Sequence, residues 1–147
     1  MKYVDASAIL RVLFTEPGAV VPVADGDRIV SSHLVEVETF RAVDRERLMG
    51  RLDDTEAATK RKELTELLAM LDLATIDATV IARAKSAFAI NVRALDAIHV
   101  ATAEVLAAEA TDEALEFWTH DDRQASAAIS RGLVVRGTSP SDSGASE

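Results

Sequence analysis

Cysteine is absent from the 147-residue chain. Its absence excludes disulfide bonds, thiolate metal sites and cysteine nucleophiles. Aromatic residues are also scarce, at 4%, although 48% of the residues are hydrophobic. An apolar fraction of this size, made mainly of Ala, Val, Leu and Ile, is typical of one globular domain with a modest core.

Long hydrophobic runs are missing as well. No apolar segment approaches the roughly 18 residues that a membrane-spanning helix needs, and Asp5 is an acid too early for a signal peptide. We therefore expect a cytoplasmic protein. The three histidines, His33, His99 and His120, show no paired spacing of the kind that zinc sites use.

The chain has no excess of basic residues. Its 25 acidic and 16 basic side chains give a net charge of −9, which does not suit a protein held to nucleic acid by a broad basic face. Any contact with nucleic acid must then come from a local cluster of Arg and Lys, or from a surface built by oligomerisation.

Short apolar segments alternate with amphipathic ones along the chain. We expect strands at 2–4, 28–30, 73–76, 115–119 and 133–135, and helices at 7–14, 33–49, 53–71, 78–89, 95–110 and 122–130. Such alternation predicts an α/β domain over residues 1–136, with a parallel sheet covered on both faces. Residues 137–147 contain Ser, Gly, Pro and acids without apolar periodicity, and we expect a disordered tail there.

Two finer expectations concern helix positions. Ser31 and Ser32 are candidate caps of the helix that follows them. The apolar spacing of the helix at 95–110 predicts that an inward stripe is formed by Leu95, Ile98, Ala101, Val105 and Ala108.

Four acidic residues lie near the ends of expected strands or early in the helices that follow. Asp5 and Asp121 follow strands, Asp96 is in the first turn of a helix, and Glu38 is one or two turns into another. Because ligands bind beyond the carboxyl ends of the strands of an open parallel sheet, these side chains predict one acidic site. Converging carboxylates repel one another and need a cation. Oxygen ligands favour a hard ion, Mg²⁺ or Mn²⁺.

Each acid taken alone has a simpler explanation. Asp before a helix is a favoured N-cap, and an acid in the first turn complements the helix dipole. Glu38 alone would be a solvated charge on a helix. The simpler explanation suits Asp96 less well. Apolar neighbours on both sides of Asp96 in the sequence predict a half-buried position, where an unpaired carboxylate is energetically costly.

Four segments resemble the sequence blocks of PIN-domain toxins of the VapC type. They are YVDASAIL at 3–10, SSHLVEVE at 31–38 with FRA at 40–42, RALDAIHVATA at 93–103, and WTHDDR at 118–123. The blocks occur in the family's order and cover residues 1 to about 136. The LDAIH segment is the most specific of them, whereas the THD segment alone would be a weak indication of the family.

The resemblance implies a PIN-like three-layer α/β/α fold with a five-stranded parallel sheet. It also implies a metal-dependent endoribonuclease, usually aimed at tRNA or rRNA, together with a VapB-type antitoxin and a homodimer. Carried over by position, the metal-site acids are Asp5, Glu38, Asp96 and Asp121, and the polar supports are Ser7 and Thr119. Glu36 and Asp122 compete with Glu38 and Asp121, and the family's spacing favours the latter pair.

In the mechanism that the resemblance implies, a metal-activated water attacks the phosphate in line and leaves a 3′-hydroxyl and a 5′-phosphate. Arginines near the four blocks are candidates for RNA phosphate contacts: Arg11, Arg41, Arg93 and Arg123. They could equally be surface arginines paired with acids. For His99, three residues after Asp96, we expect a supporting or packing role rather than metal ligation.

Two other functions compete with the nuclease. One is a catalytically silent PIN-fold protein that acts by binding a partner. The other is a phosphohydrolase with an aspartyl nucleophile, but the haloacid-dehalogenase type has Asp-x-Asp after the first strand, where this chain has Asp5-Ala6-Ser7.

Overall fold

A single parallel sheet of five strands organises the chain. The computed structural model describes residues 1–18 and 20–138, and the strand order is β3-β2-β1-β4-β5. The strands are β1 (Lys2–Val4), β2 (Ile29–Ser32), β3 (Asp72–Ala74), β4 (Glu116–Trp118) and β5 (Val134–Arg136). Every neighbouring pair is parallel, so the expected sheet is confirmed.

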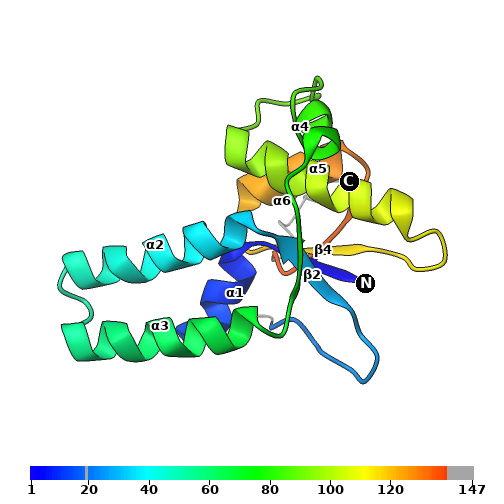
Figure 1. The fold of residues 1–147 in the computed structure, drawn as a ribbon. Helices are drawn as coiled ribbons and strands as arrows, with labels where there is room; N and C mark the ends of the chain where they lie inside the picture. The colour runs from blue at the N-terminus through cyan, green and yellow to red at the C-terminus, as the bar shows by residue number, and fades with distance from the viewer. Residues whose placement is uncertain (19, 139–147) are drawn as a thin grey trace, which may run out of the picture.

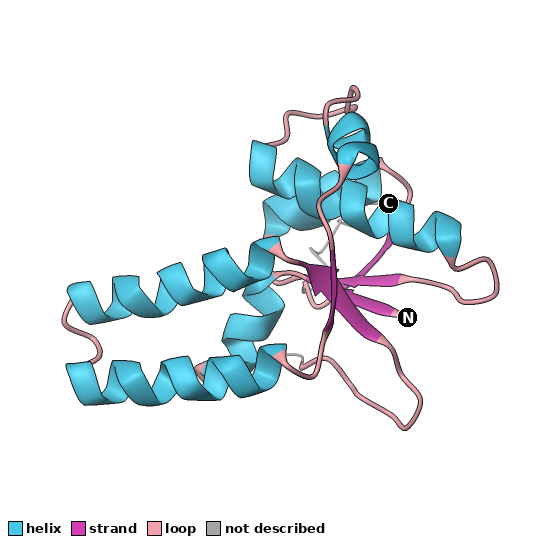
Figure 2. Ribbon diagram, viewed as in Figure 1, coloured by secondary structure: helices cyan, strands magenta, loops and turns pink. Residues whose placement is uncertain are grey.

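Helices cover both faces of this sheet, as Figures 1 and 2 show. They are α1 (Ala6–Leu13), α2 (Leu34–Leu48), α3 (Asp54–Leu68), α4 (Ala78–Ala84), α5 (Ala94–Glu109) and α6 (Asp122–Ser130). The three-layer α/β fold class is therefore confirmed. None of the helices in the described ranges is long and apolar enough to cross a membrane.

Two apolar clusters form the core, one on each face. Val4 and Trp118 pack with α1, α2 and α3, whereas Tyr3 and Phe117 pack with α5 and α6. Tyr3 pairs with Phe117 and Val4 pairs with Trp118 in the register of β1 and β4. Since successive strand residues point to opposite faces, the alternation in these short strands feeds both clusters.

The helices α2 and α3 run side by side and extend away from the sheet as an arm (Figure 1). A capping box starts α3, with Asp53 accepting from the backbone N–H of Glu56 and Glu56 accepting from that of Asp53. Leu64 and Leu68 of α3 are buried in the α1–α3 cluster. The arm is therefore joined to the domain by the sheet-proximal ends of its helices.

Two expectations about helix ends differ from the structure in part. Ser31 and Ser32 lie in β2. Ser31 donates to the carbonyl of Val4 at 2.5 Å and does not cap a helix, whereas the Ser32 hydroxyl accepts from the N–H of Leu34, the first residue of α2, at 3.1 Å, as expected of a cap. The helix expected at 78–89 ends at Ala84. It ends early because Arg131 donates to the carbonyl of Ala87 and lies over the ring of Phe88, which holds the chain out of helical geometry.

The predicted inward stripe of α5 is wrong at its ends. Leu95 is 48% exposed and Ala108 is also exposed, whereas Ala97, Val100 and Ala103 are buried. The helix is apolar nearly all round, so sequence spacing could not identify the buried face. In the structure, small alanines face the sheet.

At Gly137, directly after β5, the backbone passes close to that of Thr119. This glycine has a φ of +94°, and a Cβ added there would lie 2.6 Å from the carbonyl oxygen of Thr119. Of the segment 137–147 for which we expect a disordered tail, residues 139–147 lie outside the described ranges.

Gly137→Ala should destabilise the fold by about 1–2 kcal/mol for backbone strain, with an added cost for displacing Thr119. Gly132→Ala is the matched control, because Gly132 has a φ of +80° but open space around its Cβ position. Urea unfolding should give the larger loss of stability at Gly137; equal losses would contradict the close approach to Thr119.

Candidate functional site

A cleft of about 470 Å³ opens where β1, α1, α2, α5 and the start of α6 come together. Its lining includes Asp5, Glu38, Asp96 and Asp121, which are far apart in the sequence. Asp5 directly follows β1, and Asp121 directly precedes α6. The structure therefore brings the four sequence-predicted acids to the walls of one cleft.

Asp5 is the most buried of the four acids, with 4% of its surface exposed. Its Oδ1 accepts from the Ser7 hydroxyl at 2.6 Å and from the N–H of Ala8 at 3.0 Å. Its Oδ2 accepts from the Thr119 hydroxyl at 2.5 Å. These bonds tie the end of β1 to α1 and to the segment after β4, and they orient the carboxylate.

Ser7 and Thr119 also bind the backbone that follows β4. The N–H of His120 donates to Ser7 Oγ at 2.8 Å, and that of Asp121 donates to Thr119 Oγ1 at 3.0 Å. Asp121 then caps α6, its Oδ1 accepting from the N–H groups of Arg123 and Gln124. For Asp5 and Asp121 the simpler N-cap explanation thus holds together with a place in the cleft.

Asp96 lies in the first turn of α5 and is half-buried. Within the described ranges its carboxylate accepts no hydrogen bond. Burial, followed by the nearby charge of Asp121, raises the pKa of Asp96 above its ordinary value, although Arg93 and His99 oppose the shift. Burial likewise raises the pKa of Asp5, against the lowering effect of the hydrogen bonds from Ser7 and Thr119. The charged forms of both acids are therefore disfavoured in the folded protein.

The two competing acids lie elsewhere. Glu36 pairs with His33 at 2.7 Å on the exposed surface, whereas Glu38 lines the cleft. Asp122 is exposed and is not among the residues that line the cleft.

The donor set fits a hard divalent cation in chemistry, because it offers carboxylate oxygens. Asp5 is buried and Asp96 half-buried, whereas Asp121 is exposed. In the described ranges, however, no three Asp, Glu or His side chains are close enough together to hold a metal ion as they are. Binding would require the side chains to approach one another across the cleft.

A smaller hollow of about 390 Å³ adjoins the acidic cleft and shares Asp96 with it. Arg93 and Arg123 line this hollow, and Arg41 lines the acidic cleft. Arg41 also pairs with Asp44 at 2.7 Å. Arg11 donates to the carbonyl of Pro17 instead, and it is not among the residues that line either hollow.

The sequence analysis did not single out Arg45 and Gln124, which both line the cleft. Arg45 follows Arg41 by one helical turn, a spacing that could have indicated it. Gln124 is 2% exposed and donates to the backbone carbonyl of Asp96 at 3.3 Å. It lies three residues after Asp121, so the same periodicity places it beside that acid.

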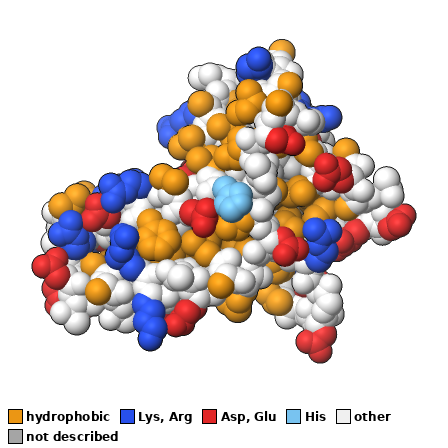
Figure 3. Space-filling model, in the orientation of Figure 1, with side chains coloured by type: hydrophobic (Ala, Val, Ile, Leu, Met, Phe, Trp, Pro, Cys, Tyr) orange, Lys and Arg blue, Asp and Glu red, His pale blue; other side chains and the backbone are white. Residues whose placement is uncertain are grey.

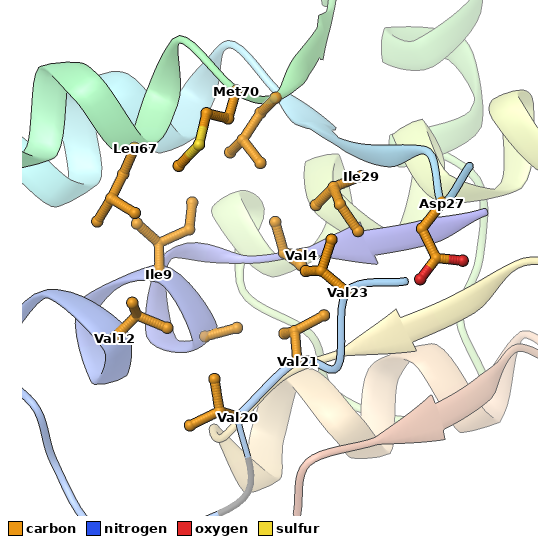
Figure 4. Close-up of a pocket in the computed structure, with 12 residues that line it drawn as sticks. Val4, Ile9, Val12, Val20, Val21, Val23, Asp27, Ile29, Leu67 and Met70 are labelled. Atoms are coloured by element: carbon orange, nitrogen blue, oxygen red, sulfur yellow. The ribbon is translucent and has the colours of Figure 1, made fainter. Parts of the chain in front are cut away.

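A separate apolar cavity of about 310 Å³ lies between α1, the end of α3 and the segment before β2 (Figure 4). The charged residue in its lining is Asp27. Asp27 accepts from Lys2 at 2.7 Å, which lowers the pKa of that carboxyl. This cavity therefore lacks the chemistry of the acidic cleft.

Asp96→Asn should stabilise the metal-free protein at neutral pH. The pKa of Asp96 is raised on folding, so the stability it contributes is complete below its unfolded pKa of about 3.9 and is lost as pH rises through the folded value. Urea unfolding in chelator should give a gain for the variant that is largest near pH 7 and vanishes near pH 3.5. A less stable variant at pH 7 would contradict this electrostatic account.

Comparison with known proteins agrees with this architecture. The PIN domain profile matches residues 2–130. The chain is 33% identical over 143 residues to Ribonuclease VapC46 of Mycobacterium tuberculosis (strain ATCC 25618 / H37Rv), a match covering 90% of this chain and 94% of that protein. The crystal structure of PAE2754 from Pyrobaculum aerophilum is similar in fold, with a TM-score of 0.53 and 17% identity over 91% of this chain and 82% of that one.

The family expected from the four sequence blocks is thus confirmed by a domain match over most of the chain and by a relative that is similar along nearly its whole length. The chain belongs to the PIN-domain family.

Proposed function

We propose that this protein is a Mg²⁺- or Mn²⁺-dependent endoribonuclease, the toxin of a VapBC-type toxin–antitoxin module. The observation that carries the proposal is the meeting of Asp5, Glu38, Asp96 and Asp121 around one cleft. The similarity of this chain to a protein named as a VapC ribonuclease supports the same activity. Structured RNA, tRNA or rRNA, is the proposed substrate, with 3′-hydroxyl and 5′-phosphate ends as products.

The four carboxylates would hold the cation, and Ser7 and Thr119 would keep Asp5 oriented toward it through the hydrogen bonds described above. When bound, a divalent cation polarises the scissile phosphate and lowers the pKa of a water molecule. The raised pKa values of Asp5 and Asp96 give a reason why the site favours a cation, since its positive charge offsets the cost of burying them ionised.

Arginines beside the acids would bind the RNA backbone. Arg93 and Arg123 line the adjoining hollow, Arg41 and Arg45 line the acidic cleft, and Arg45, Arg93 and Arg123 form no ion pair within the described ranges. Basic and acidic side chains are interspersed over the arm in Figure 3, with no broad basic surface on that face. This distribution favours local contact beside the cleft and fits the net charge of −9.

The proposed protein partners are a VapB-type antitoxin and a second copy of the chain. The similarity to a VapC protein supports both proposals. The competing function, partner binding without cleavage, would be favoured if Mn²⁺ gave no rise in melting temperature.

Asp5→Asn and Asp96→Asn should each lower RNA cleavage by at least about 100-fold, because each removes a carboxylate that would bind the cation; loss of a group that only supports a ligand already costs 10–100-fold. The assay is digestion of total RNA with Mn²⁺, with and without chelator, and mapping of the new ends. Glu36→Gln is the matched control and should keep activity within about 2-fold, because Glu36 is exposed and paired with His33. Full cleavage by Asp96→Asn would overturn the proposal.

Removing Arg93 or Arg123 should weaken RNA binding and lower the salt dependence of the affinity. The slope of log K against log salt should fall by about 0.7 for each RNA phosphate that the variant no longer neutralises. Binding of a fluorescent RNA is measured in the Asp5→Asn background, where the RNA is not cut. Arg28→Ala is the control, because Arg28 pairs with Asp72 away from the cleft. An equal effect of Arg28→Ala would contradict local binding of RNA beside the cleft.

A further inference from the structure

A buried histidine lies in the wall of the acidic cleft. His99 of α5 is 2% exposed, and both of its ring nitrogens have partners. Nε2 lies 2.7 Å from Oε2 of Glu38, and Nδ1 lies 2.7 Å from the hydroxyl of Tyr3. A buried imidazole that satisfies both nitrogens in this way has a fixed ring orientation.

The direction of these hydrogen bonds follows from their chemistry. A carboxylate can only accept, so Nε2 donates to Glu38. In a neutral imidazole the other nitrogen accepts, and the Tyr3 hydroxyl is the donor to it. A tyrosine hydroxyl ordinarily ionises only at about pH 10, so it can donate at neutral pH. A proton therefore lies on Nε2 in either protonation state of the ring.

Tyr3 is itself held rigidly in the centre of the sheet. It is fully buried on β1, its ring stacks on that of Phe117 with centroids 5.0 Å apart, and it meets the His99 ring edge-on at 5.9 Å. The chain of hydrogen bonds therefore runs from the central strand through α5 to a side chain of α2.

Glu38 is the end of this chain that faces the cleft. Its Oε2 is used by His99, whereas its Oε1 accepts no hydrogen bond within the described ranges. Glu38 lies on a helix of the projecting arm, and without the bond to His99 its flexible side chain would have no partner among the described residues to hold it. The bond to His99 leaves one carboxylate oxygen available to a cation.

We propose that His99 is a positioning residue for the metal site, which holds the carboxylate of Glu38 toward the cation while Tyr3 fixes the imidazole ring. The inference rests on the proposed function, since it assumes that Glu38 binds a cation. Groups that hydrogen-bond a ligating side chain contribute 10–100-fold to metal affinity or activity.

Two substitutions of His99 separate positioning from packing. The amide nitrogen of Gln reaches about as far as Nε2 and can donate to Glu38, whereas that of Asn reaches only about as far as Nδ1. His99→Asn should weaken Mn²⁺ binding 10–100-fold, and His99→Gln should stay within about 3-fold of the unchanged protein. Tyr3→Phe, which keeps the ring stack but removes the donor to Nδ1, should weaken binding by a smaller factor.

The readout is the Kd for Mn²⁺ from calorimetry without RNA. In cleavage assays, His99→Asn should raise the Mn²⁺ concentration for half-maximal rate by the same factor, with kcat at saturating Mn²⁺ and KM for RNA changed much less. Thr39→Val is the matched control for stability, because Thr39 is buried on α2 beside Glu38 but donates only within that helix, to the carbonyls of Val35 and Glu36. Mn²⁺ affinity should be unchanged in Thr39→Val, whatever the effect of the substitution on the melting temperature.

Glu38→Gln distinguishes failure of this inference from failure of the proposed function. If Glu38→Gln weakens Mn²⁺ binding and His99→Asn does not, the positioning role is wrong and the metal site stands. If Asp5→Asn and Glu38→Gln both leave Mn²⁺ binding unchanged, the proposed metal site and the role of His99 are both overturned. Should His99→Asn fail to fold, an unchanged affinity in Tyr3→Phe would overturn the positioning role.

Discussion

The burial of one carboxylate at the end of the central strand is the constraint on which the rest of this site depends. Asp5 follows β1, and its oxygens accept from a side chain and a backbone N–H of α1 and from Thr119 after β4. Thr119 in turn accepts from the N–H of Asp121, at the start of α6. The hydrogen bonds that satisfy Asp5 thus set the position of a second acid of the cleft.

This arrangement buries carboxylates whose charged forms are poorly solvated. Burial raises the pKa of Asp5, and burial together with Asp121 raises that of Asp96. For stability alone, carboxylates are better exposed to water or paired with basic side chains. Here Arg93 acts on Asp96 too weakly to cancel the effect of burial. The positive charge of the proposed cation would offset this cost.

Much of the fold and of the site's composition could be predicted from the sequence. The alternation of short strands and helices indicated the parallel sheet, and the positions of Asp5 and Asp121 after strands indicated one edge of it. The buried face of α5 could not be predicted, because the helix carries alanines and larger apolar residues on nearly every side. Packing alone decides that Leu95 is exposed. The early end of α4 depends on Arg131, which is distant in sequence. The His99–Glu38 bond likewise joins residues 61 apart, so no local pattern contained it.

The metal site can be tested by diffraction from crystals soaked in Mn²⁺, collected where manganese scatters anomalously. We expect an anomalous peak in the acidic cleft within about 2.0–2.3 Å of oxygens from at least two of the acids Asp5, Glu38, Asp96 and Asp121, with the rest bound directly or through water. A cleft without a peak at saturating Mn²⁺, or a peak held by other residues, would contradict the proposed metal site.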